Sequence, residues 1–145
     1  MVSDNTPKQS GSIIFSRGSE GTSIGLNLPP EGSGESAKKT VSANHSLIEM
    51  SDIPSASTII LNYRTSPTSG TVRSSITLRT THNKTSLNRT EYSYLLNTYA
   101  VNDFVTSGLG LKVIAKKEGP SPQADVKADH EIDCYVTLSP SPPSA

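Results

Sequence analysis

The sequence contains little of what stabilises or anchors small secreted and membrane proteins. Cys134 is the only cysteine in 145 residues, which excludes an internal disulfide and a cysteine-based zinc site. No apolar run approaches the roughly 20 residues of a membrane span. The first residues, Met1 to Asn5, have neither the basic nor the apolar part of a signal peptide. We therefore expect an intracellular, cytoplasmic protein, or a virion component if the source is viral.

Net charge is also absent, but the charges are segregated along the chain. Residues 1–52 carry a net charge of −2, residues 53–117 carry +6, and residues 118–145 carry −4. Zero net charge together with 31 Ile, Leu, Val and Phe residues favours a small folded core over full disorder. The basic middle and the acidic end attract one another within one molecule or between copies, so self-association is an expected property.

The stretch that organises the chain is a predicted β-hairpin. Apolar and polar residues alternate over 58–65 and again over 72–81, which is the period-two pattern of half-buried strands. Residues 66–70 between them contain a proline and a glycine, which are typical of turns. When the apolar sets share one face, the opposite face carries three arginines: Arg64, Arg73 and Arg79.

The remaining pattern predicts a mainly β protein. Short strands are expected at residues 13–15 and 24–28, as a second hairpin, and at 47–50. Residues 30–45 are rich in Gly, Ser, Glu and Lys and predict a mobile loop. The expected fold is an antiparallel β-sandwich or partly open barrel of six or seven strands with one inserted helix. The expected division is a flexible arm at 1–11, one β-rich domain at 12–138 and a Pro/Ser-rich tail at 139–145.

The inserted helix is expected at residues 89–100, with an extension to Val105 as an option. Asn88 followed by Glu91 has the spacing of a capping box, and apolar residues follow at helical spacing. A strand through Tyr92, Tyr94 and Leu96 is the alternative.

Two further strands are expected near the end of the chain, at residues 109–116 and 131–138. Their alternation places Cys134 inward as a small buried hydrophobe. We expect these two strands to pair antiparallel, with Ala115 opposite Ile132 and Lys116 opposite Glu131.

Chemistry-bearing patterns are scarce. The three histidines lie in expected loops or at strand starts and have no nucleophile or carboxylate at a recognisable spacing. No cofactor, metal ion or small-molecule substrate is therefore inferred. One set of residues suits oxyanions, because Arg and Lys bind phosphate and carboxylate groups. These candidate polyanion-binding residues are Arg64, Arg73, Arg79, Lys84, Arg89, Lys112 and Lys116.

An ordinary solvated sheet face is the favoured interpretation of the arginines, since polar residues alternate on any one-sided sheet. For the whole chain we expect a non-enzymatic structural or assembly protein. A small viral coat or matrix subunit that self-associates and contacts nucleic acid through the basic face fits this description by analogy. The alternative is a monomeric adaptor or nucleic-acid-binding module that uses the basic face, or the tail at 140–143, toward nucleic acid or an acidic protein surface. An enzyme with a site built from distant loops is the third option.

Overall fold

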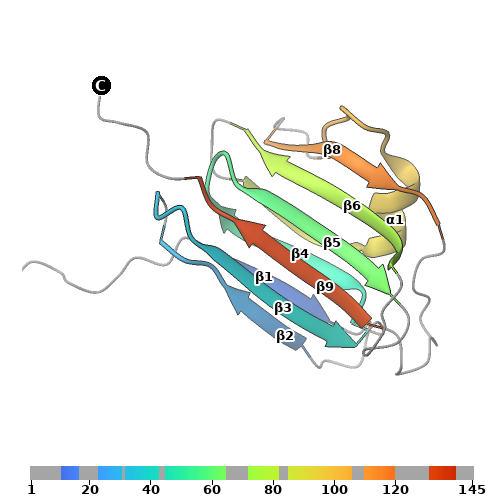
Figure 1. Cartoon of the computed structure of the whole chain (residues 1–145), viewed down its shortest axis with the longest axis horizontal. Helices are drawn as coiled ribbons and strands as arrows, with labels where there is room; N and C mark the ends of the chain where they lie inside the picture. The colour runs from blue at the N-terminus through green and yellow to red at the C-terminus, as the bar shows by residue number, and fades with distance from the viewer. Residues whose placement is uncertain are drawn as a thin grey trace, which may run out of the picture.

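Two antiparallel β-sheets pack face to face, and neither closes on itself (Figure 1). The computed structural model describes residues 11–16, 23–30, 32–42, 45–64, 72–81, 85–105, 110–119 and 131–139. The fold is therefore mainly β, and of the two expected architectures it is the sandwich that is confirmed. The described residues form nine strands and one helix, where six or seven strands were expected.

The smaller sheet has four strands in the order β2-β1-β4-β7. The hairpin expected near the start of the chain is confirmed, because β1 pairs antiparallel with β2 and Phe15 lies opposite Ile24. Alternation buries Ile13, Phe15, Ile48 and Met50 on the inner side of this sheet. The strands are β1 (Ser12–Ser16), β2 (Ser23–Asn27), β4 (Leu47–Ile53) and β7 (Thr85–Glu91).

The larger sheet has five strands in the order β3-β9-β5-β6-β8. The predicted central hairpin is confirmed as β5 and β6, with Leu61 opposite Ile76 and both fully buried. Its turn at residues 66–70 lies outside the described residues. The strands are β3 (Ser36–Ser42), β5 (Thr58–Arg64), β6 (Val72–Thr80), β8 (Leu111–Lys117) and β9 (Glu131–Thr137).

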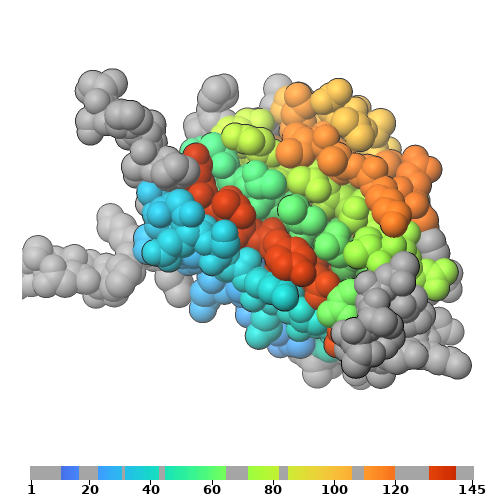
Figure 2. Space-filling view, in the orientation of Figure 1, coloured from blue at the N-terminus to red at the C-terminus, as the bar shows by residue number. Residues whose placement is uncertain are grey.

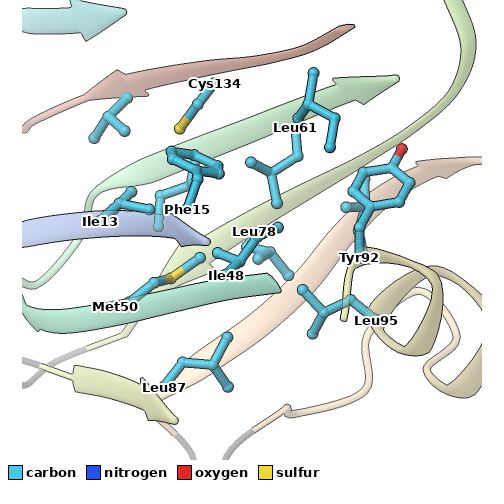
Figure 3. Packing of buried hydrophobic residues seen from close by; sticks show 14 of the residues in the cluster. Ile13, Phe15, Ile48, Met50, Leu61, Leu78, Leu87, Tyr92, Leu95 and Cys134 are labelled. Carbon is cyan, nitrogen blue, oxygen red and sulfur yellow. The ribbon is translucent and has the colours of Figure 1, made fainter. Parts of the chain in front are cut away.

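The core fills the space between the two sheets (Figure 3). Phe15 on β1 points toward Cys134 on β9, so a large side chain of one layer faces a small side chain of the other. Cys134 is fully buried, as predicted, and its burial raises the pKa of the thiol to about 12. The thiol therefore behaves as a small hydrophobe in the folded protein.

The predicted helix exists as α1 (Tyr92–Thr98), but it starts later than expected and its predicted cap is wrong. The strand β7 continues to Glu91, and the Glu91 carboxylate accepts a hydrogen bond from the Ser46 hydroxyl (3.1 Å) instead of completing a capping box with Asn88. Tyr92 is buried with its hydroxyl 3.0 Å from Ser74 Oγ, and burial raises the pKa of Tyr92 to about 12. No described helix has the length and hydrophobicity needed to cross a membrane.

The loop expected at residues 30–45 is wrong over its second half, which forms strand β3. Ala37 lies opposite Val136 and Val41 lies opposite Ile132, so β3 lengthens the larger sheet beyond β9. The Gly- and Ser-rich composition hid this strand because its inward residues include only one large hydrophobe, the buried Val41. An edge strand needs fewer apolar residues than a central one because it buries less of its surface.

The pairing predicted between the last two strands is also wrong. Strand β8 pairs with β6, whereas β9 pairs with β5 and β3. Most of the predicted inward residues that are described are buried: Leu111, Val113, Ile132, Cys134, Val136 and Leu138. Ala115 is the exception, because it is exposed and lies opposite Thr77 on the outer side. Alternation shows which face of a strand is buried but carries no information about its neighbour. The central hairpin has a free edge on each side, and each of the two strands takes one.

Candidate polyanion-binding face

The candidate site is the outer face of the five-stranded sheet, meaning the side chains that point away from the four-stranded sheet. Figure 2 shows this face directly, with β3, β9, β5, β6 and β8 crossing it and no described element lying over them. Helix α1 contacts β6 from the other side, where Tyr92 reaches Ser74 on the inner face. As far as the described residues go, the outer face is thus an uncovered surface of hydroxyls, cations and a few rings.

The structure separates the seven predicted residues. Four lie on the outer face: Arg64, Arg73, Arg79 and Lys112. Arg89 lies on β7 in the other sheet, and Lys84 lies outside the described residues. Lys116 points inward. The predicted common patch is therefore only partly assembled, and even Arg73 and Arg79 are six residues apart on one strand, roughly 20 Å.

One end of the outer face holds an ion-paired group, called here the paired corner: Arg64, Glu131, Asp133 and Thr40. Arg64 Nε lies 2.6 Å from Asp133 Oδ2, and its Nη2 lies 3.0 Å from Asp133 Oδ1 and 2.8 Å from Glu131 Oε1. Thr40 Oγ1 donates a further hydrogen bond to Asp133 Oδ1 (2.7 Å). These contacts join three neighbouring strands, so Arg64 is committed to holding the sheet together.

The electrostatics of the paired corner follow from those contacts. Asp133 is only 4% exposed, and this burial by itself raises the pKa of its carboxyl. The hydrogen bonds from Arg64 and Thr40 and the positive charge of Arg64 outweigh burial, and they hold the pKa of Asp133 below its usual value. The same hydrogen bond to Asp133 is the main cause that raises the pKa of Arg64.

The other end of the outer face holds what we call the cationic row: Arg79, Lys112 and Phe104. Arg79 on β6 lies directly opposite Lys112 on β8, and Phe104 forms a β-bridge with Lys112 on its far side. The Lys112 ammonium lies 5.7 Å from the centroid of the Phe104 ring, which is 38% exposed. Neither cation of the row forms an ion pair within the described part of the chain. Two like charges therefore stand side by side without an acid between them.

The cationic row continues across the sheet as hydroxyls. Arg79 lies opposite Thr58, Thr58 lies opposite Thr137, and Thr137 lies opposite Ser36. The acid next to the row in sequence, Asp103, has its carboxylate engaged in a turn, where it accepts the N–H of Ala100 (2.8 Å). The row thus presents hydrogen-bond donors suited to phosphate oxygens.

Lys116 was predicted as a polyanion ligand, and the structure corrects this. A β-bulge places one extra residue, Ile114, between Ala115 opposite Thr77 and Val113 opposite Leu78. The extra residue reverses the alternation, so Lys116 lies opposite the buried Ile76 on the inner side. Its ammonium donates to the carbonyls of Leu96 (2.8 Å) and Tyr99 (2.9 Å) at the end of α1. Lys116 therefore satisfies the helix C-terminus.

Sequence reasoning missed three contributors to the outer face. Lys38 was assigned to a loop, yet on β3 its ammonium lies 5.2 Å from the ring centroid of Tyr135 on β9. Phe104 was treated only as an optional end of the helix. Tyr135 follows the inward Cys134 and so faces outward by alternation, and that signal alone could have marked it as a ring beside cations. The partners of all three come from distant parts of the chain, so local spacing could not identify them.

A separate pocket of about 330 Å³ lies between β7 and the segment that follows α1. The Tyr94 and Tyr99 rings meet edge to face there, with centroids 5.9 Å apart. The rest of its lining is mixed polar and apolar: Ser86, Leu87, Asn88, Thr90 and Val105. Arg89 is exposed on the same strand. Arg89 is not among the described residues that line the pocket.

The described residues contain no group of three or more His, Cys, Asp or Glu side chains arranged to hold a metal ion. Two of the histidines considered in the sequence, His82 and His130, lie outside the described residues. The fold defines the class of the protein as a two-layer antiparallel β-sandwich with a cationic outer face. Comparison of the chain with protein-family models, with curated proteins and with solved structures finds no match.

Proposed function

We propose that this chain is a non-enzymatic structural protein that binds a polyanion, nucleic acid in particular, through the outer face of its five-stranded sheet. The observation that carries the proposal is the pair Arg79 and Lys112, which are adjacent in register and have no acid partner among the described residues. Like charges directly opposite each other destabilise a sheet. An anion bound between them removes that repulsion, so binding and sheet stability are coupled.

Other cations extend the favourable field over the face. Arg73 and Lys117 are exposed on β6 and β8, and Lys38 is exposed on β3. The two acids of the face, Glu131 and Asp133, are neutralised in part by Arg64 at the paired corner. Phosphate binding by such a surface releases counterions and depends steeply on salt.

Self-association is the second part of the proposal. It is supported by the opposite charges of residues 53–117 and 118–145, which attract when the segments belong to different copies. A structural protein with these two properties fits the role of a small viral coat or matrix subunit.

The test of polyanion binding is fluorescence anisotropy with a labelled RNA over a range of salt concentrations. Replacing Arg79 and Lys112 together with glutamate is expected to weaken binding about 100-fold and to lower the salt slope by about two. Arg89→Glu changes the charge by the same sign on the other sheet and serves as the control. Arg89→Glu changes the net charge by half as much, so an accompanying loss of about tenfold would mean that net charge alone, and not this face, determines binding.

The test of self-association is light scattering behind a sizing column, at low and high salt. Large species that dissociate in salt are expected. A strict monomer that still binds RNA would favour the monomeric nucleic-acid-binding module over the assembly protein.

A further inference from the structure

The outer face carries aromatic rings next to its cations, and this arrangement sharpens the choice of ligand. Resting on the proposed function, we propose that the face binds single-stranded nucleic acid, with bases stacked on Phe104 and Tyr135 and phosphates held by Arg79 and Lys112. Phe104, Lys112 and Arg79 are consecutive in one cross-strand row. Antiparallel partners in register point to the same side of a sheet, so the ring and both cations share the outer face.

The second ring lies across the sheet on the same face. Tyr135 pairs with Lys38 on one side and with Ile60 on the other, and all three point outward. Four strand spacings separate Tyr135 on β9 from Phe104 beyond β8, which is roughly 19 Å. A single strand of about four nucleotides or more can bridge that distance, which is the smallest footprint of known sheet-based binders.

The surface between the two rings suits an unpaired nucleic-acid strand. Ile60 and Thr77 are half-buried and lie opposite each other, and Thr58 lies beside Arg79. The middle of the face is thus weakly polar, and the cationic row stands at one end of it. This order matches a nucleic-acid strand that turns its bases toward the sheet and keeps its phosphates near the cationic row.

A duplex fits this face poorly. Reading the bases of a duplex requires an element that enters a groove, and stacking requires bases that are not already paired. The one helix among the described residues packs behind β6, on the side away from this face (Figure 1). Each ring already attracts a cation, Lys38 at Tyr135 and Lys112 at Phe104, and such contacts are weak at exposed sites. Each cation can therefore leave the ring for a phosphate.

The test uses the full chain and three probes: a labelled single-stranded RNA of roughly 12 nucleotides, the corresponding duplex, and inorganic polyphosphate, which has charge but no bases. Phe104→Leu is expected to weaken single-strand binding about tenfold and to leave polyphosphate binding unchanged. Phe104→Tyr keeps a ring and is expected to restore binding. Tyr135→Leu is expected to act like Phe104→Leu. Unchanged polyphosphate binding also shows that each variant is folded.

Three results would overturn the inference. In the first, single-strand binding survives Phe104→Leu and Tyr135→Leu but is lost on charge reversal of Arg79 and Lys112. That result would leave the proposed function standing and remove the stacking role. Tighter binding of the duplex than of the single strand would do the same. A loss caused by Tyr94→Ala instead would move the site to the pocket beside β7. If the wild-type protein binds none of the three probes, the proposed function itself fails.

Discussion

The two ends of the outer face present the same residue type in opposite situations. At the paired corner, Arg64 contacts two carboxylates and is 15% exposed in its side chain. In the cationic row, Arg79 is exposed and stands beside another cation. The first arginine joins strands, and the second forms no ion pair with any residue that the structure describes. The comparison teaches that charge on a sheet face acquires a role only from its cross-strand neighbours.

The largest expected effect comes from breaking the paired corner. Arg64→Ala leaves the buried carboxylate of Asp133 without its charged partner, and we expect a loss of about 3 kcal/mol in the free energy of unfolding. Urea denaturation measures it. In an Asp133→Ala background the same change should cost much less, since no buried charge remains unpaired. A loss below about 0.5 kcal/mol in the single variant would show that the corner is an ordinary surface pair.

A smaller effect is expected from acid. The pKa of Asp133 is lower in the folded protein than its ordinary value of 3.8, so its contribution to stability is fully present above that value. The contribution is lost as the pH falls through the lowered folded-state pKa. Unfolding free energies measured between pH 6 and pH 2 should therefore fall more steeply for the wild type than for Asp133→Asn. Parallel curves for the two proteins would contradict the lowered folded-state pKa of Asp133.

A loss of stability smaller than that of Arg64→Ala is expected to distinguish two neighbouring lysines on β8. Lys116→Ala removes the donor to the Leu96 and Tyr99 carbonyls, and we expect a loss of about 1.5 kcal/mol. Lys117→Ala is the matched control, because Lys117 is exposed on the outer face and, within the part of the chain that the structure describes, donates only to the Val72 carbonyl. Thermal melts of both variants measure this difference in stability. Equal melting temperatures would mean that the β-bulge does not direct Lys116 inward.

The smallest effect on stability is expected in the cationic row. Arg79→Ala removes one of two adjacent like charges, so the unfolding free energy should stay within about 0.5 kcal/mol of the wild type or rise slightly. The same variant should weaken RNA binding measurably. Together with Arg64→Ala, it separates an arginine that stabilises from one that binds. A clear loss of stability would show that Arg79 has a structural partner.

Much of the fold followed from the local pattern. In the described parts of residues 58–65 and 72–81, the period-two alternation correctly predicted the central hairpin and its buried face, and the same rule predicted the burial of Cys134. The candidate site was predicted less well. Arg79 and Lys112 were included correctly as outward cations, but Arg64 and Lys116 turned out to have structural partners. Phe104 was never considered as a ring beside a cation.

The difference between what the sequence predicted and what it did not predict has a physical reason. The side-chain period of a strand is a local property, so the sequence by itself determined which residues of most strands are buried. Three features depend on residues far apart in the chain: the choice of neighbour for β8 and β9, the bulge at Ile114, and the contact of Arg64 with Asp133. Each is decided only when strands that are far apart in the chain come together, because sheet edges and charged side chains find their partners at that stage. Only the tertiary structure therefore decided which cations face an acid and which remain exposed beside an aromatic ring.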